Sequence, residues 1–327
     1  MAVEEPVGGA QSARRRFALP KGMGLIWVLL ALCVAAALLS SSFLNLYNIM
    51  NVLRQVALYG IVSVGMTFVI LTKGIDLSVG SILGVSAVMA ALMLVAGSPV
   101  WMVVIAVLLG GAVMGAINGL GVTVGMIPPF IMTLGTMVMG RGLALTLAGG
   151  QPIGLGARAQ DFMWLGRGAV FGVPVPVVVF AIVAAVAIYV LRYTAYGRQI
   201  YAVGSNTEAA RLSGINVGVV TFSVYVISGF LASLTALIFV SRLTVGEPTA
   251  GTGIELEAIA ITVIGGTSLF GGEGGIVGTI IGASILAVLA NLMNLVGISP
   301  FTQQIVKGAI IVGAVLYEML RKRRARH

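Results

Sequence analysis

Long apolar windows with few charged side chains follow one another along this chain. A helix needs about 20 consecutive apolar residues to cross a bilayer, and each window approaches that length. We therefore predict an all-α membrane protein with ten transmembrane helices. Glycine-rich stretches blur the ends of the windows that close near residues 125 and 272. The predicted spans lie near residues 23–40, 52–71, 78–96, 100–125, 129–147, 174–191, 217–239, 254–272, 275–296 and 300–320.

Composition excludes the other broad classes of protein. Hydrophobic residues make up 59% of the 327 residues and charged residues only 9%, against about 25% in an average soluble domain. A soluble globule could not cover so much apolar surface, and disordered chains are polar and rich in charge. Ten spans occupy about 200 residues, which leaves no room for a folded soluble domain. We expect a cytoplasmic tail at 1–22, a single transmembrane domain at 23–320 and a basic cytoplasmic tail at 321–327.

Several kinds of chemistry are also excluded. The only cysteine is Cys33, so no intrachain disulfide can form, and the only histidine is His327. We therefore expect neither a histidine-based catalytic site nor a metal site, and we predict that the chain is not an enzyme. A nucleotide-binding P-loop needs a glycine immediately before its lysine, and none of the four lysines has one. Any ATP chemistry belongs to another chain, and we expect this chain to bind no cofactor.

The net charge of +9 indicates topology rather than nucleic-acid binding. Cytoplasmic loops of membrane proteins hold an excess of Lys and Arg. With both termini in the cytoplasm, thirteen of the nineteen basic residues lie inside, three lie outside and three fall within spans. We therefore predict an even number of spans and cytoplasmic termini, in a bacterial inner membrane. The outside residues are Arg158, Arg167 and Arg242, and those within spans are Arg54, Arg141 and Lys307.

A cluster of arginines before the first apolar window allows a second interpretation. Arg14, Arg15 and Arg16 also resemble a twin-arginine export signal. Removal of the first window as a signal would leave nine spans, put the termini on opposite sides and spoil the charge balance. We interpret the cluster as a cytoplasmic anchor of the first span.

Two pairs of loop segments resemble each other. Residues 73–78 (KGIDLS) are similar to residues 252–257 (TGIELE), and residues 124–130 (VGMIPPF) are similar to residues 295–301 (LVGISPF). The members of each pair are five predicted spans apart, an odd number, so they lie on opposite sides of the membrane. This pattern predicts an inverted repeat, a common scaffold of alternating-access transporters. Chance similarity between short loops rich in Gly and Pro is the alternative.

A few uncharged polar residues within the spans are candidates for a solute pathway. Asn291 and Asn294 lie on one face of the ninth predicted span, and Ser284 extends that face. Asn118 lies in the fourth span. Such side chains offer donors and acceptors without a strong charge, which suits a neutral, hydroxyl-rich solute. The alternative role is hydrogen bonding between helices.

Four charged residues lie within or at the ends of spans, at similar depth in the outer half. They are Arg141, Glu255, Glu257 and Lys307. Charges in a membrane normally need a partner or a wet cavity, so one interpretation is ion pairing. The other is that each long side chain extends independently to the interface.

The longest predicted cytoplasmic connection, residues 192–216, contains signals for a short helix. Asn206 or Ser205 can cap its start, Glu208 lies in its first turn and Gly214 can stop it. We expect its small residues, Ala210 among them, to be exposed. A short surface helix of this kind is a poor core element and fits the cleft of a partner protein.

Four long motifs follow one another along the chain: LTKGIDLSVGS at 71–81, YGRQIYAVGSNTEAARLSGI at 196–215, PTAGTG at 248–253 and GGTSLFGG at 265–272. In this order they resemble the permease subunits of ribose-type ATP-binding-cassette sugar importers. The resemblance covers about residues 43–316. The sequence departs from the family pattern at Gly246 and Glu247, which bears on sugar preference or on the contact with a binding protein.

The resemblance implies three protein partners besides the lipid membrane. They are a cytoplasmic ATPase, an extracytoplasmic sugar-binding protein and a second permease copy, with no nucleic acid. It also implies that the segment from Asn206 to Ile215 is a coupling helix that sits in the ATPase cleft. The implied coupling residues are Gly204, Asn206, Glu208, Ala209, Ala210, Arg211, Ser213, Gly214 and Ile215.

We therefore interpret the chain as the permease of an ATP-driven importer of ribose or a similar small monosaccharide, acting by alternating access. A stand-alone secondary transporter or channel is the first rival. It would need coupling ions, normally held by paired carboxylates, for which Glu255 and Glu257 are the candidates. A membrane-embedded enzyme is the second rival, and the absence of a usable histidine argues against it.

Overall fold

The computed structural model describes residues 23–325, and each of the ten predicted apolar windows contains a helix, although the helix in the eighth window fills only its first half. The predictions for residues 1–22, including the arginine cluster, and for residues 326–327 lie outside the described residues. The long helices are α1 (Met23–Leu39), α2 (Leu46–Leu71), α3 (Val79–Val95), α4 (Val100–Thr123), α5 (Pro129–Leu147), α8 (Val175–Tyr193), α11 (Val217–Leu243), α12 (Ile254–Ile264), α13 (Ile276–Leu295) and α14 (Pro300–Ala325).

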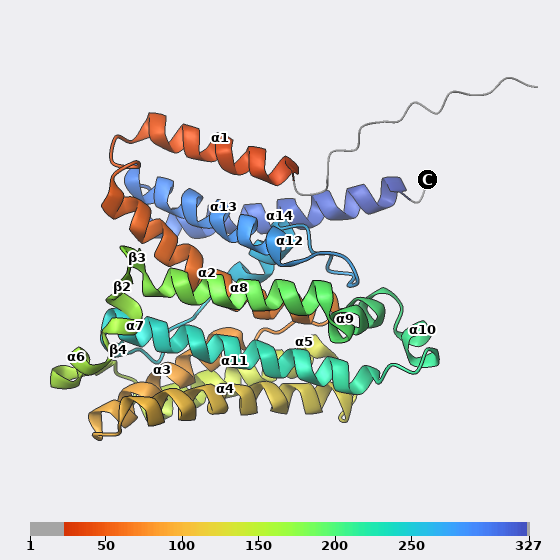
Figure 1. The fold of residues 1–327 in the computed structure, drawn as a ribbon, viewed down its shortest axis with the longest axis horizontal. Helices are drawn as coiled ribbons and strands as arrows, with labels where there is room; N and C mark the ends of the chain where they lie inside the picture. Colours follow the sequence, from red (N-terminus) through yellow and green to blue (C-terminus); the bar gives the residue numbers. More distant parts are fainter. Residues whose placement is uncertain (1–22, 326–327) are drawn as a thin grey trace, which may run out of the picture.

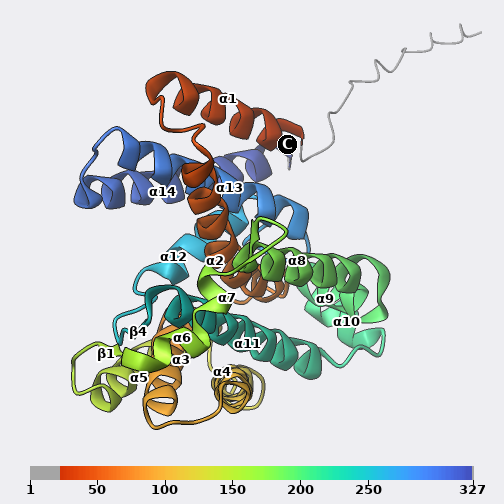
Figure 2. The same cartoon turned by 60° about the vertical axis from the view of Figure 1, so that its left-hand side comes forward.

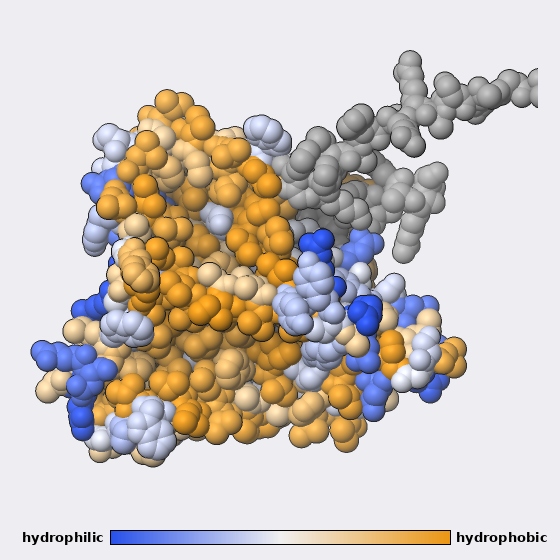
Figure 3. All heavy atoms as spheres, viewed as in Figure 1, coloured by the Kyte–Doolittle hydropathy of each residue, from blue (hydrophilic) through white to orange (hydrophobic). Residues whose placement is uncertain are grey.

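Six of these helices are long and apolar enough to cross a membrane: α2, α4, α5, α8, α11 and α13. Helices α1 and α3 are also apolar but have only 17 residues each. Large hydrophobic side chains are exposed on the outer faces of α1, α4, α5 and α8. Figure 3 shows the result, a broad apolar belt between two hydrophilic ends. This arrangement suits a protein surrounded by lipid.

The predicted span at 254–272 is wrong in its second half. Helix α12 ends at Ile264, and the residues that follow form an irregular loop before α13. Gly266, Gly271 and Gly272 adopt φ values of 87°, 77° and 71°, which L side chains rarely tolerate. The segment is still apolar, so hydropathy alone could not separate it from a helix.

Short elements cover the two ends of the bundle (Figure 1). One end, here called the strand end, holds two antiparallel ribbons, β1 with β4 and β2 with β3, together with small helices. The opposite end holds α9 (Ala195–Ser205) and α10 (Thr207–Leu212). The elements of the strand end are β1 (Ile153–Gly154), η1 (Gly156–Arg158), α6 (Ala159–Phe162), α7 (Trp164–Arg167), β2 (Ala169–Val170), β3 (Val173–Pro174) and β4 (Val245–Gly246).

Helices α2 and α11 are the most buried of the six long apolar helices and form the centre of the bundle (Figure 2). Helix α2 packs against α11, α12 and α13, while α11 also packs against α3 and α4. The contact between α11 and α4 is the most extensive, and glycine makes it close. A Cβ atom on Gly115 would overlap the backbone of Tyr225, and one on Gly229 would overlap the backbone of Gly111 and Gly115. Small residues are what allow membrane helices to approach this closely.

Candidate functional site

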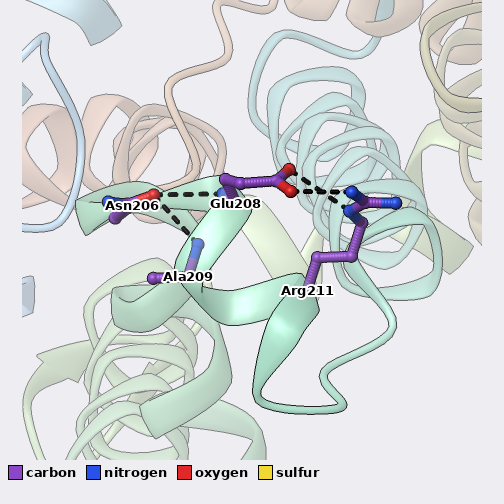
Figure 4. Close-up of polar contacts among 4 residues, drawn as sticks. All are labelled: Asn206, Glu208, Ala209 and Arg211. Atoms are coloured by element: carbon purple, nitrogen blue, oxygen red, sulfur yellow. Dashed lines mark hydrogen bonds and ion pairs between the residues drawn. The ribbon is translucent and has the colours of Figure 1, made fainter.

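Helix α10 begins as its sequence predicts (Figure 4). The Asn206 side chain accepts hydrogen bonds from the backbone N–H groups of Glu208, at 3.1 Å, and Ala209, at 3.0 Å. Asn206 is therefore the N-cap, and Ser205 is instead the last residue of α9. Arg211 pairs with Glu208 at 2.7 Å across one turn. The cap and the acidic first turn both stabilise a helix of only six residues.

The end of α10 is also as predicted, because Gly214 adopts the left-handed conformation with φ 80°. The N–H of Ile215 binds the carbonyl of Ala210, and that of Gly214 binds the carbonyl of Arg211. These two bonds define a Schellman stop. The segment is thus a short, rigid turn of helix with a defined entry and exit.

The structure corrects the prediction of which residues of α10 are exposed. Ala210 is not exposed: its side chain is only 3% accessible and belongs to the main core cluster. The exposed positions are instead Glu208, Ala209, Arg211 and Ser213, together with Leu212, which is 78% accessible. Leu212 is the one large apolar side chain among these exposed positions of α10.

Behind α10, Gly204 fixes α9 against two other segments. A Cβ atom at Gly204 would overlap the Leu71 carbonyl at the end of α2 and the Gly272 nitrogen in the loop after α12. The Gly272 N–H donates to that same Leu71 carbonyl at 3.0 Å. Three backbone segments therefore cross where no side chain fits, and α9 is held directly against the membrane-embedded helices.

A cavity of about 350 Å³ lies toward the strand end, between α2, α11, α12 and α13. Its size falls within the usual range for small-molecule sites, roughly 300–1,000 Å³. Asn291 exchanges two hydrogen bonds with Asn48 of α2, at 2.7 and 3.0 Å. Asn294 accepts a bond from Gln303 of α14 at 2.7 Å. Among the polar lining residues are Asn48, Asn51, Gln55, Tyr59, Thr235, Arg242, Asn291 and Asn294.

The other two pathway candidates lie outside this cavity. Asn118 is fully buried, donates to Ser78 at 2.7 Å and accepts from Thr136 at 2.7 Å. Both ends of its amide are thus used between helices. Ser284 donates to the carbonyl of Ile280 in its own helix. The geometry therefore favours the structural alternative for Asn118, whereas the Ser284 bond stays within α13 and supports neither role.

The four charged residues are held in two different ways. Lys307 forms an ion pair with Glu257, and their side chains are 26% and 19% exposed. Arg141 donates instead to the carbonyls of Pro248, at 2.6 Å, and Ala250, at 2.9 Å. Glu255 accepts from the N–H of Gly253 at 3.1 Å. Ion pairing is therefore confirmed for one pair, while the arginine binds backbone oxygen.

A fully buried carboxylate that is not among the residues predicted from the sequence is Asp76, in the loop between α2 and α3. One oxygen accepts from the N–H and hydroxyl of Ser78, at 3.0 and 2.6 Å, and the other from Ser228 of α11, at 2.7 Å. Through Ser78 the network continues to Asn118 in α4 and Thr136 in α5. The available signal was an acidic residue in an apolar stretch with a serine two positions later, the pattern of an Asx-turn.

Comparisons with known proteins agree on one family. Residues 48–315 match the family model described as the permease component of the branched-chain amino acid transport system. The chain is 46% identical over 290 residues to the ribose import permease of Haemophilus influenzae, covering 88% of this chain and 90% of that protein. It is 47% identical over 295 residues to the ribose import permease of Bacillus subtilis, covering 89% and 90%. Identity to the xylose transport permease of Escherichia coli is 35% over 365 residues, covering 92% and 93%. No solved structure matches the chain.

Proposed function

We infer the function of this chain from its family, because it belongs to the permease components of binding-protein-dependent ATP-binding-cassette importers. It is a multi-pass membrane permease and not a catalytic enzyme, and ATP is hydrolysed by a separate subunit. We propose that it carries ribose or a similar small monosaccharide, by alternating access. One observation supports this function most directly: the same molecule has a capped, exposed helix at one end and an amide-lined cavity toward the other.

We propose that the segment from Asn206 to Ile215, which contains α10, sits in a cleft of the ATPase. Its exposed face, centred on Leu212, supports this role. Differential binding of ATP to one state of the ATPase pair would then bias the permease between its two conformations. The buried Ala210 does not touch the partner in this arrangement but holds α10 to its own core.

For the solute, we propose a path through the amide-lined cavity past Asn291 and Asn294. Amides on its wall can exchange hydrogen bonds with sugar hydroxyls, because each offers both a donor and an acceptor. Glu257 is already paired with Lys307, so among the described residues it does not form the free carboxylate pair that a secondary transporter would need.

We propose ten spans arranged as a five-helix inverted repeat that relates α1–α5 to α8 and α11–α14. Two observations support it. Helix α2 packs on α12 and α13, and α11 packs on α3 and α4, which is the same pairing with the halves exchanged. Met126 and Gly297, at matching positions of the similar loops, both have positive φ, 55° and 80°. The cavity is lined from both halves, as expected for a pathway at a repeat interface.

We further propose that two copies form the membrane unit. Helix α5 supports this, because Gly135 and Gly142 lie seven residues apart and no atom lies within 4 Å of a Cβ built on either. Open glycines beside exposed Val138 and Met139 provide a surface that a second helix can approach closely. The domain limits proposed above, 23–320 with two cytoplasmic tails, are unchanged.

The coupling role is tested by Leu212→Asp and Ala209→Asp, which place a charge on the exposed face of α10. Burial of an unpaired charge in a protein cleft costs several kcal/mol, so we expect co-purification of the ATPase and ATP-driven uptake to fall by at least about tenfold. Ala210→Asp is the matched control, because its charge enters the permease core and lowers the thermal stability of the permease itself. Normal uptake and normal ATPase association in both surface variants would contradict the coupling role.

A further inference from the structure

Helix α10 does not reach the cavity lined by amides. A movement of α10 can therefore affect the cavity only through another element of the protein. Helix α10 packs mainly on α9, with a smaller contact to α11. Helix α9 therefore stands between the proposed ATPase contact and the rest of the bundle. The contacts of α9 with the membrane helices therefore determine which of those helices move when α10 is displaced.

One side-chain hydrogen bond joins α9 to the glycine-rich loop between α12 and α13. The Tyr201 hydroxyl donates to the carbonyl of Gly274 at 2.9 Å. Burial raises the pKa of the Tyr201 phenol, so it stays protonated and remains a donor at physiological pH. In Figure 1 this loop extends from α12 toward the end of the bundle that carries α9.

One side of the loop that receives this bond borders open space, whereas Gly272 on the same loop is bonded to the Leu71 carbonyl. A second cavity, of about 530 Å³, lies between α8, α9 and the loop. Leu191, Tyr201 and the segment 274–278 are among the residues on its wall. The loop also contains glycines at positive φ, which lack the side chains that would lock the backbone in one conformation.

Helix α12 connects the loop to the cavity lined by amides. It has 11 residues, which corresponds to a length of about 16 Å. Ile254, its first residue, and Gly251 just before it line that cavity. Glu257, one turn further on, carries the ion pair with Lys307.

Gly274 lies ten residues after the end of α12 and two residues before the start of α13. The N–H of Ser268, in the part of the loop that follows α12, donates to the carbonyl of Glu273 at 2.8 Å. A displacement at Gly274 can therefore reach α12, and so the wall of the solute site, through this bond across the loop.

We propose that Tyr201 is a positioning residue for transport: its hydrogen bond to Gly274 passes the movement of α9 and α10 to α12 and so to the cavity. The proposal rests on the coupling role of α10 proposed above. The chain offers a matched control on the same helix. Tyr196 makes a hydroxyl bond of similar quality, 2.6 Å to Ser223, but that bond leads to α11 and not to the loop.

The test compares Tyr201→Phe with Tyr196→Phe in the complete complex with its ATPase and binding protein, reconstituted in vesicles. We expect Tyr201→Phe to lower the sugar transported per ATP hydrolysed by about fivefold, the factor that one neutral hydrogen bond is worth. ATPase turnover and complex assembly should stay at the parent level. Tyr196→Phe should keep the parent ratio of sugar to ATP.

A second readout reports α12 directly. Ile254→Cys in a Cys33→Ala background should react with a small thiol reagent at rates that differ between ATP-bound and nucleotide-free complexes. Addition of Tyr201→Phe should abolish this difference. A difference that persists, together with a normal sugar-to-ATP ratio, overturns the proposal for Tyr201 alone. If even the parent with Tyr201 shows no difference, transmission to α12 is overturned and the proposal fails, while the coupling role of α10 is decided separately by the Leu212→Asp and Ala209→Asp variants.

Discussion

At the scale of single residues, Asp76 shows how one buried group ties several helices together. Its carboxylate accepts three hydrogen bonds from Ser78 and Ser228, and so joins a loop to α11. A fully buried carboxylate is tolerable only when its oxygens are satisfied in this way. The sequence could not reveal this, because Ser228 lies 152 positions from Asp76. By contrast, Asn206 and its helix could be predicted, because every partner of that cap lies within three positions.

We predict that Asp76→Asn lowers the stability of the permease. The amide has one acceptor oxygen where the carboxylate has two, so at least one of the three hydrogen bonds to the carboxylate is lost or weakened, at a cost of about 1–3 kcal/mol. Thermal unfolding of the detergent-solubilised permease measures this loss of stability as a lower melting temperature. Asp161→Asn is the matched control: its carboxylate pairs with Arg158, but the two side chains are 52% and 47% exposed, and such a surface pair is worth little. Equal melting temperatures for the two variants would show that the Asp76 network does not stabilise the fold.

At the scale of elements, apolar windows predict where helices lie but not always where they end. The ten windows coincide with ten helices because about 20 apolar residues in lipid have few alternatives to a helix. Helix α12 is the exception, since its glycine-rich end is apolar but adopts positive φ angles. The prediction that Ala210 is exposed is wrong for a related reason. Helix α10 is short, and the face that it turns to the core depends on its packing against α9 and α11.

The crossing of α4 and α11 gives a prediction for an element contact. Gly229→Ala places a methyl group against the backbone of Gly111 and Gly115, and overpacking of this kind costs about 1–3 kcal/mol. We expect a lower melting temperature and a smaller yield of folded permease. Gly24→Ala in α1, where no atom lies within 4 Å, should leave both unchanged. If Gly229→Ala behaves like Gly24→Ala, the close approach of these helices is not needed for stability.

At the scale of the whole molecule, the proposed account depends on which end faces the cytoplasm. Lys73, Arg192, Arg198 and Arg211 belong to the end that carries α9 and α10, and Arg158, Arg167 and Arg242 to the strand end. Short loops that hold an excess of basic residues face the cytoplasm. The hydropathy pattern could predict a molecule with its loops at two opposite ends of a helix bundle. It could not predict the cavity, because the lining of the cavity comes from helices far apart in the sequence.

The sidedness of two single cysteines tests this orientation most directly. In a Cys33→Ala background, Ala157→Cys lies at the exposed strand end and Thr207→Cys at the start of the exposed α10. We predict that a membrane-impermeant thiol reagent labels residue 157 in intact cells and labels residue 207 only after the membrane is permeabilised. The reverse pattern would put α10 outside the cell, away from any ATPase, and would contradict the proposed mechanism.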